Sequence, residues 1–144
     1  MIRTSASIVV RPALESDYPS IARVQQQCPE AAQWPVGDYS AFEVLLALAD
    51  NTPAGFCAWR QVAPEEAELL NLGVAPEYRG IGVATALLEA LARAATGEIF
   101  LEVAEPNSAA IALYTRAGWV STGLRRGYYH QGTINAVVMK KRSC

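Results

Sequence analysis

The chain has 144 residues, of which 51% are hydrophobic and 18% are charged, and its formal net charge at pH 7 is −2. This composition argues against disorder, because the apolar residues suffice for one compact core. The sequence has no block of like charges and no apolar run of membrane-spanning length, which argues against nucleic acid and membrane as partners. Because the start also lacks a signal-like apolar stretch, we expect a single cytoplasmic domain over residues 1–144.

The cysteines and the histidine do not indicate a metal site. Cys28, Cys57 and Cys144 lie far apart and are odd in number, and His130 is the single histidine. This spacing suits neither a disulfide framework nor a set of metal ligands. We expect reduced thiols and no bound metal.

The first half of the chain predicts a strand, a helix and a hairpin. Residues 7–11 predict a strand, and Ser16 and Asp17 can cap a helix that runs to about Gln27, where Cys28-Pro29 ends it. The irregular segment 30–39 receives no assignment. Residues 43–49 and 54–61 predict the two strands of a hairpin around the turn 50–53.

The second half alternates strands and helices. Residues 68–74 are nearly all apolar, as in a central strand, and residues 81–95 predict a helix. A strand at 98–103, a short helix from Asn107 to Arg116 and a final hairpin (119–129 and 134–140, across 130–133) follow. A strand–helix–strand passage requires a crossover, so part of the sheet should be parallel. The helix 81–95 should bury one stripe, formed by Val83, Leu87, Leu91 and Ala94.

The turn before this helix could bind phosphate. Gly80 and Gly82 remove side chains from a bend whose N–H groups lie at the positive end of a helix dipole, and Arg79 adds a cation. An ordinary tight turn is an equally good interpretation of two glycines. A Walker loop is excluded because Val83-Ala84 follow Gly82, and a dinucleotide fingerprint lacks its third glycine.

Two further residues could carry chemistry. Glu102 lies in an apolar strand on the same face as Phe100, where a partly desolvated carboxylate can act as a general base; a structural ion pair is the alternative. Tyr114 lies near the end of a short helix, and a phenol can protonate a departing thiolate; packing is the alternative. Asn107 by itself predicts a helix cap.

Aromatic residues at two places could contact an acceptor. Arg125-Arg126-Gly127-Tyr128-Tyr129 could line a groove for a peptide or another acceptor, or could form a solvated strand. Trp34 could contact the acceptor or anchor the core.

Taken in order, these residues resemble the GNAT superfamily of acyl-CoA-dependent N-acetyltransferases. Arg79-Gly80-Ile81-Gly82-Val83-Ala84 matches the pyrophosphate signature Gln/Arg-x-x-Gly-x-Gly/Ala of that family, and it follows the strand that ends in Asn71-Leu72-Gly73-Val74. Within the superfamily the chain is most similar to the RimI-type ribosomal-protein-alanine N-acetyltransferases. The narrower match is carried by Leu101-Glu102-Val103, by residues 107–114 and by residues 125–129. Two departures are Ile134-Asn135, where an acidic pair is common, and Pro106, where a small residue is common.

The resemblance implies a mixed α/β fold of the GNAT type. Its central, mostly antiparallel sheet contains a splayed parallel strand pair and is flanked by helices. It implies acetyl-CoA as co-substrate, with Glu102 as base and Tyr114 as acid, and with Trp34, Tyr128 and Tyr129 contacting the acceptor. Cofactor contacts are implied for Leu72, Gly73, Val74, Arg79, Gly80, Ile81, Gly82, Val83, Ala84, Asn107 and Tyr114, with the N–H of Val74 facing the oxyanion.

The implied reaction is direct acetyl transfer to a primary amine. The acceptor we expect is the N-terminal α-amine of a protein, such as a ribosomal protein. One alternative is a small amine or amino acid on the same scaffold. Another is a non-catalytic acyl-CoA-binding module, against which the presence of both Glu102 and Tyr114 argues.

Overall fold

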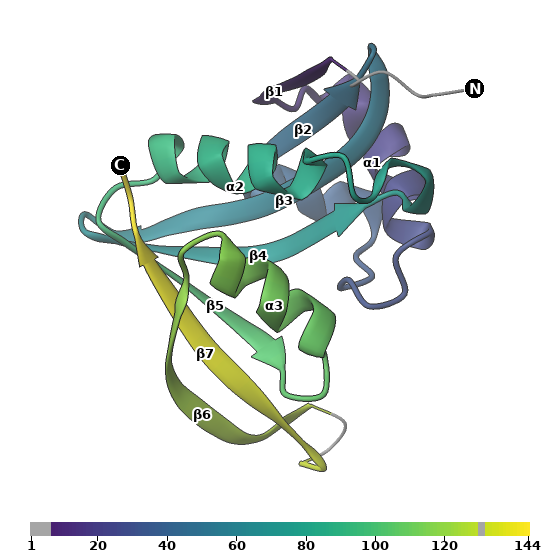
Figure 1. Ribbon diagram of the computed structural model, residues 1–144. Helices are drawn as coiled ribbons and strands as arrows, with labels where there is room; N and C mark the ends of the chain where they lie inside the picture. The colour runs from purple at the N-terminus through teal and green to yellow at the C-terminus, as the bar shows by residue number, and fades with distance from the viewer. Residues whose placement is uncertain (1–6, 130–131) are drawn as a thin grey trace. The chain divides into compact units, whose positions relative to one another are not determined.

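The computed structural model describes residues 7–129 and 132–144, and within them the chain forms one mixed sheet in the order β1-β2-β3-β4-β5-β7-β6 (Figure 1). The pair β4–β5 is parallel, whereas β1–β2, β2–β3, β5–β7 and β7–β6 are antiparallel. This confirms the predicted mixed sheet with one parallel pair. The elements are β1 (Ile8–Pro12), α1 (Tyr18–Gln26), β2 (Glu43–Ala49), β3 (Thr52–Ala63), β4 (Glu66–Val74), α2 (Val83–Ala94), β5 (Glu98–Ala104), α3 (Ser108–Arg116), β6 (Val120–Tyr129) and β7 (Ile134–Arg142).

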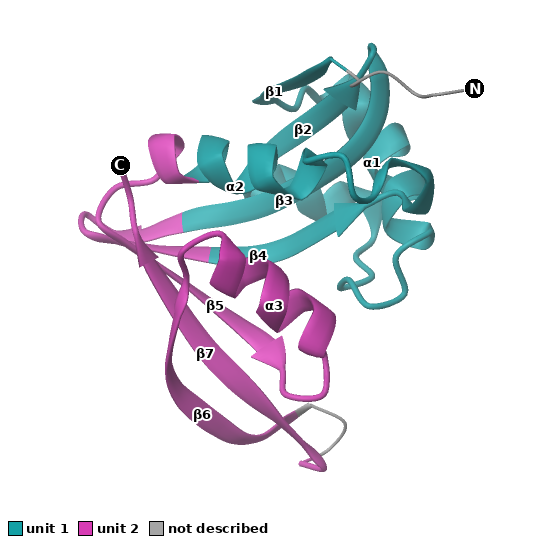
Figure 2. Cartoon of the chain, viewed as in Figure 1, with its two compact units in different colours: residues 1–60, 69–91 teal, residues 61–68, 92–144 magenta. Residues whose placement is uncertain are grey.

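The chain divides into two compact units (Figure 2). Unit 1 comprises residues 1–60 and 69–91, and unit 2 comprises residues 61–68 and 92–144. Strands β3 and β4 and helix α2 each contribute residues to both units. The prediction of one domain over residues 1–144 therefore stays a prediction.

The core of unit 1 forms around α1 and the hairpin β2–β3. The hairpin turns through Asp50 and Asn51, whose φ values of 47° and 67° are those of a two-residue hairpin turn. Asp17 stands at the N-terminus of α1, but its carboxylate accepts from the N–H of Leu14 and from Arg11 instead of capping the helix. The unassigned segment 30–39 leads into a short 3-10 helix, Val36–Ala41. The buried core residues include Ile21, Val24, Cys28, Tyr39, Val44, Leu46 and Phe56.

Helix α2 buries a wider arc than the sequence predicted. Val83, Leu87 and Leu91 are buried as expected, whereas Ala94 is exposed in the last turn. Leu88, Ala92 and Ala95 are buried as well. Successive residues turn by about 100° around a helix, so Ala94 lies between Val83 and Leu87 on the buried arc, and its exposure comes from its place at the end of α2.

Unit 2 is built on β5, β7 and β6. Exposure alternates along β5, where Ile99, Leu101 and Val103 are buried. Helix α3 begins as predicted, because the Asn107 side chain accepts the N–H of Ala110 at 3.2 Å. Lys141 of β7 donates to the carbonyl of Ala117 at 2.6 Å and so binds the end of α3 to the sheet. The predicted turn between β6 and β7 falls partly on His130 and Gln131, which lie outside the described residues.

Candidate active site

The last part of β4 offers backbone groups that β5 does not use. In the described residues, the parallel ladder joins only Glu66–Glu68 to residues 98–100. The N–H of Ala75 donates to the carbonyl of Ala54 on β3 at 2.8 Å. Because alternate N–H groups of a strand point to opposite sides, the N–H groups of Leu72 and Val74 face away from β3. A ligand that pairs like a strand can bind at this edge.

The end of β4 is braced by side chains. The carbonyl of Val74 accepts from Cys28 Sγ at 3.2 Å and from Arg79 Nε at 3.1 Å. Burial raises the pKa of the Cys28 thiol, an effect that the Arg79 guanidinium opposes, so the thiol keeps the proton that it donates. The other side of the Arg79 guanidinium forms an ion pair with Glu30 at 2.8 Å. Arg79, the cation predicted for the glycine turn, is therefore already paired with groups of the protein.

The glycine turn has the backbone conformation and the open space that a phosphate group needs. Gly80 and Gly82 have φ values of +80° and +96°, which favour glycine. A Cβ at Gly80 would meet no described atom within 4 Å, and one at Gly82 would meet only Ile8 Cδ1 at 3.9 Å. These positive φ values explain why α2 begins at Val83 and not at Ile81. The N–H groups of Val83 and Ala84, in the first helical turn, have no carbonyl partner within the helix.

In unit 2, the structure brings Glu102 and Tyr128 together through Arg125. The Glu102 side chain is 22% exposed on the face of β5 opposite its buried residues. Arg125 NH1 lies 3.0 Å from Glu102 Oε1 and 3.4 Å from Oε2. The same guanidinium covers the ring of Tyr128, with 4.3 Å between the guanidinium carbon and the ring centroid. Glu102 thus forms an ion pair, which was the alternative interpretation from the sequence, and Tyr128 lies on the same side.

The remaining predicted residues are packed or capping groups. Tyr114 is buried, with its ring centroid 5.8 Å from that of Trp119. Trp34 packs against Tyr39 and Phe42 in unit 1, with centroid distances of 5.6 Å and 5.0 Å. The side chain of Tyr129 lies outside the described part of the structure. The chemical roles predicted for these residues stay predictions.

Sequence reasoning missed two asparagines that position the site. Asn71, 5% exposed, accepts the N–H of Ala32 at 3.1 Å and donates to its carbonyl at 2.9 Å, which fastens the segment after α1 to β4. Asn135 accepts the N–H of Gly127 at 3.0 Å and donates to Glu105 at 3.2 Å. A polar residue inside an apolar strand was the available signal in both cases. Asn71 is a buried amide, which needs hydrogen-bond partners, whereas Asn135 is half-buried.

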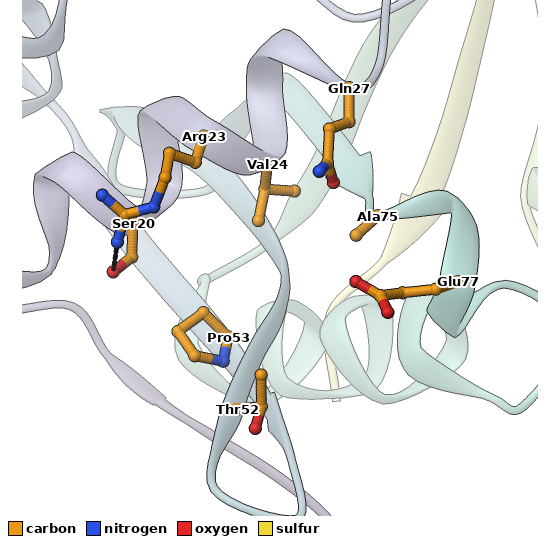
Figure 3. A pocket seen from close by; sticks show the side chains of 8 residues that line it. All are labelled: Ser20, Arg23, Val24, Gln27, Thr52, Pro53, Ala75 and Glu77. Atoms are coloured by element: carbon orange, nitrogen blue, oxygen red, sulfur yellow. Dashed lines mark hydrogen bonds between the residues drawn. The ribbon is translucent and has the colours of Figure 1, made fainter.

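A separate pocket lies within unit 1 (Figure 3). It has a volume of about 260 Å³ and lies between α1, the start of β3 and the residues after β4. Arg23, which donates to Ser20 at 2.9 Å, and Glu77 supply its charges. None of the predicted site residues lines it. Within residues 7–129 and 132–144 there is no cluster of metal-ligating side chains, and no helix there has the length and apolarity to cross a membrane.

Solved structures share this fold. The crystal structure of the ribosomal-protein-S18-alanine N-acetyltransferase from Escherichia coli matches with a TM-score of 0.81 and 26% identity, over 95% of this chain and 94% of that one. A phosphinothricin acetyltransferase from Sinorhizobium meliloti, in complex with AcCoA, matches with a TM-score of 0.75 over 97% of this chain and 89% of that one. At 17% identity the second match is a likeness of fold alone. The fold is therefore that of an acetyltransferase.

Sequence relatives identify the family. The [ribosomal protein bS18]-alanine N-acetyltransferase of E. coli strain K12 is 31% identical over 134 residues, which cover 86% of this chain and 90% of that protein. The N-alpha-acetyltransferase RimI of Mycobacterium tuberculosis is 40% identical over 91 residues, which cover 62% of this chain and 58% of that protein. The acetyltransferase (GNAT) family matches residues 10–119. The chain belongs to the GNAT acetyltransferase family, which confirms the predicted resemblance.

Proposed function

We propose that the protein transfers the acetyl group of acetyl-CoA to the N-terminal α-amine of a protein. The observation that carries this proposal is the open glycine turn between the free edge of β4 and the start of α2. The E. coli relative named for alanine N-acetylation of a ribosomal protein supports this class of acceptor, as does the mycobacterial N-alpha-acetyltransferase. Such an acceptor is made in the cytoplasm, where we place the reaction.

Acetyl-CoA would be held mainly by backbone groups. The diphosphate would bind N–H groups of residues 79–84, because the positive φ values of Gly80 and Gly82 leave room for it. The pantetheine arm would pair with Leu72 and Val74, while Asn107 and Tyr114 would contribute further cofactor contacts. The N–H of Val74 would then stabilise the oxyanion, a contribution of about 3 kcal/mol for one such donor. Cys28 and Arg79 hold the carbonyl of this same residue and so fix its backbone.

The proposed chemistry is direct attack by a neutral amine. An α-amine has a pKa of about 8 and is mostly protonated at neutral pH, so Glu102 would take a proton from it, directly or through water. The amine nitrogen then bonds to the thioester carbon, and the bond from that carbon to sulfur breaks. Tyr114 would give a proton to the departing thiolate, and the second proton that the nitrogen loses would return to Tyr114 through water. Trp34, Tyr128 and Tyr129 would contact the acceptor.

The function is tested by thiol release from acetyl-CoA with a panel of acceptors. The panel contains a peptide that begins with alanine, the same peptide with a blocked N-terminus, and small amines and amino acids. We expect release with the free α-amine and little with the blocked peptide. A preference for a small amine would favour the alternative function, a small-molecule N-acetyltransferase. Binding of acetyl-CoA without thiol release for any acceptor would support a non-catalytic acyl-CoA-binding module.

The base is tested by Glu102→Gln. This change should lower kcat by at least about 100-fold, the scale of general base catalysis, while the affinity for acetyl-CoA stays nearly unchanged. Glu89→Gln, on the exposed face of α2, is the matched control and should keep full activity. Full activity in Glu102→Gln would remove this carboxylate from the mechanism.

A further inference from the structure

We propose that Arg125 determines the choice of acceptor by donating a hydrogen bond to the carbonyl oxygen that adjoins an α-amine. Peptide N-termini and amino-acid amides would then be preferred over amines that lack this carbonyl. The inference rests on the proposed function, in which Glu102 receives the proton of the amine. All the residues that carry it lie in unit 2.

The first support is the position of the guanidinium. Arg125 NH1 donates to both oxygens of Glu102, at 3.0 Å and 3.4 Å, and the guanidinium carbon lies over the ring of Tyr128. A guanidinium carries five N–H donors, and a carboxylate offers about four acceptor positions. In the proposed function Glu102 receives the amine, so an ammonium group and the guanidinium of Arg125 would lie side by side on one carboxylate.

The second support is the local backbone of β6. Arg125 and Tyr128 are three residues apart, so a regular strand would place them on opposite faces. The register of β6 against β7 shifts between Arg125 and Tyr129, and Gly127 has a φ of +63°. This irregularity turns Tyr128 to the same side as Arg125. The irregularity is fixed from outside β6, because Asn135 accepts the N–H of Gly127 and also donates to Glu105.

The third support is the donors that remain. The Arg125 side chain is 58% exposed, and in the described chain NH1 is the guanidinium nitrogen that donates to a protein acceptor. Nε and the second terminal nitrogen are thus available to a ligand beside Glu102. In a peptide N-terminus or an amino-acid amide, the carbonyl oxygen of the first residue lies within about 4 Å of the amine nitrogen, by the standard bond lengths of the backbone. A lysine ε-amine has only methylene groups at that distance, so it offers Arg125 no acceptor.

The experiment uses the 144-residue protein and compares two amines of similar skeleton, alanine amide and isopropylamine, as acceptors of the acetyl group. Wild type should use the amide with the higher kcat/KM. Arg125→Met should reduce the ratio of the two kcat/KM values by about 10- to 100-fold, the range for a hydrogen bond to a charged donor. Arg125→Lys should give a ratio between those of wild type and Arg125→Met, because an ammonium group is a single charge without the forked donors of a guanidinium. Comparing ratios between variants cancels the different basicities of the two amines.

The matched control is Arg126→Met. Arg126 is the next residue of the same strand, is exposed, and carries the same charge, so this variant should keep the wild-type ratio. A ratio that is unchanged in Arg125→Met, or that falls equally in Arg126→Met, would overturn the inference while the proposed function stands. If wild type releases no thiol with any amine, the proposed function fails and this inference fails with it. Because Arg125 is largely exposed, thermal unfolding should report folded protein for each variant.

Discussion

Asp17 binds the first strand to the first helix, and it makes stability depend on pH. Its carboxylate accepts from Arg11 at 2.7 Å and 3.1 Å and from the N–H of Leu14 at 2.8 Å. These hydrogen bonds, that of Arg11 first, hold the pKa of Asp17 below its ordinary value. A carboxyl with a lowered folded-state pKa contributes stability above the unfolded pKa of about 3.9 and loses it as the pH falls through the folded value.

Asp17→Asn should therefore cost about 1–2 kcal/mol in the free energy of unfolding at pH 7. The difference from wild type should shrink below about pH 4, because protonated Asp17 also loses its charge-assisted hydrogen bonds. Urea unfolding at pH 7 and at pH 3 measures both values. An equal difference at the two pH values would contradict the pKa assignment.

Arg79 distinguishes a backbone phosphate site from a side-chain one. Its guanidinium is bound to Val74 and Glu30, so the N–H groups of the glycine turn should supply most of the affinity for CoA. Arg79→Met should weaken CoA binding by less than about tenfold. Gly82→Ala should weaken it more, because a side chain then enters the open space at a φ of +96°. Calorimetric titration measures both, and loss of binding in Arg79→Met alone would make this side chain a direct phosphate ligand.

At the level of elements, the turn from α2 into β5 depends on Gly97. This residue has a φ of +83°, and a Cβ there would lie 2.1 Å from the carbonyl oxygen of Glu65. That oxygen also accepts the N–H of Glu98 at 3.0 Å, so it cannot move without breaking the start of β5. Gly97→Ala should destabilise the protein by more than about 3 kcal/mol, through strain and overlap together.

Gly37 provides the control for Gly97. A Cβ at Gly37 would meet no described atom within 4 Å, and its φ is not in the left-handed region. Gly37→Ala should change the free energy of unfolding by less than about 1 kcal/mol. Chemical denaturation of both variants separates a required glycine from a replaceable one, and equal effects would contradict this difference.

The elements that show a regular apolar pattern or a local capping signal were predictable from the sequence. The strand at Glu43–Ala49 agrees with the prediction to the residue, and the cap at Asn107 forms as expected. These features depend on neighbours along the chain, such as apolar runs and a capping amide. The mixed sheet was predictable for the same reason, because a strand–helix–strand passage restricts the connection.

The contacts that orient the site were not predictable in this way. The partners of Arg79 and Asn71 lie 49 and 39 residues away along the chain, at Glu30 and Ala32. A single sequence carries no periodic signal for pairs so far apart. The same holds for the shift at Gly127, since nothing in residues 125–129 specifies that Asn135 will receive that N–H.

At the level of the whole molecule, the two units share their main elements. β3, β4 and α2 each have residues in both units. If one unit unfolded alone, each of these three elements would be broken in the middle. We therefore propose that residues 1–144 unfold as one cooperative domain, and calorimetry should give a van't Hoff enthalpy equal to the calorimetric one. CoA at about 100 times its Kd should raise that single transition by roughly 5–10 °C, from about 2.7 kcal/mol of binding linkage. Two transitions, of which CoA shifts only one, would instead define two domains and restrict the cofactor to one of them.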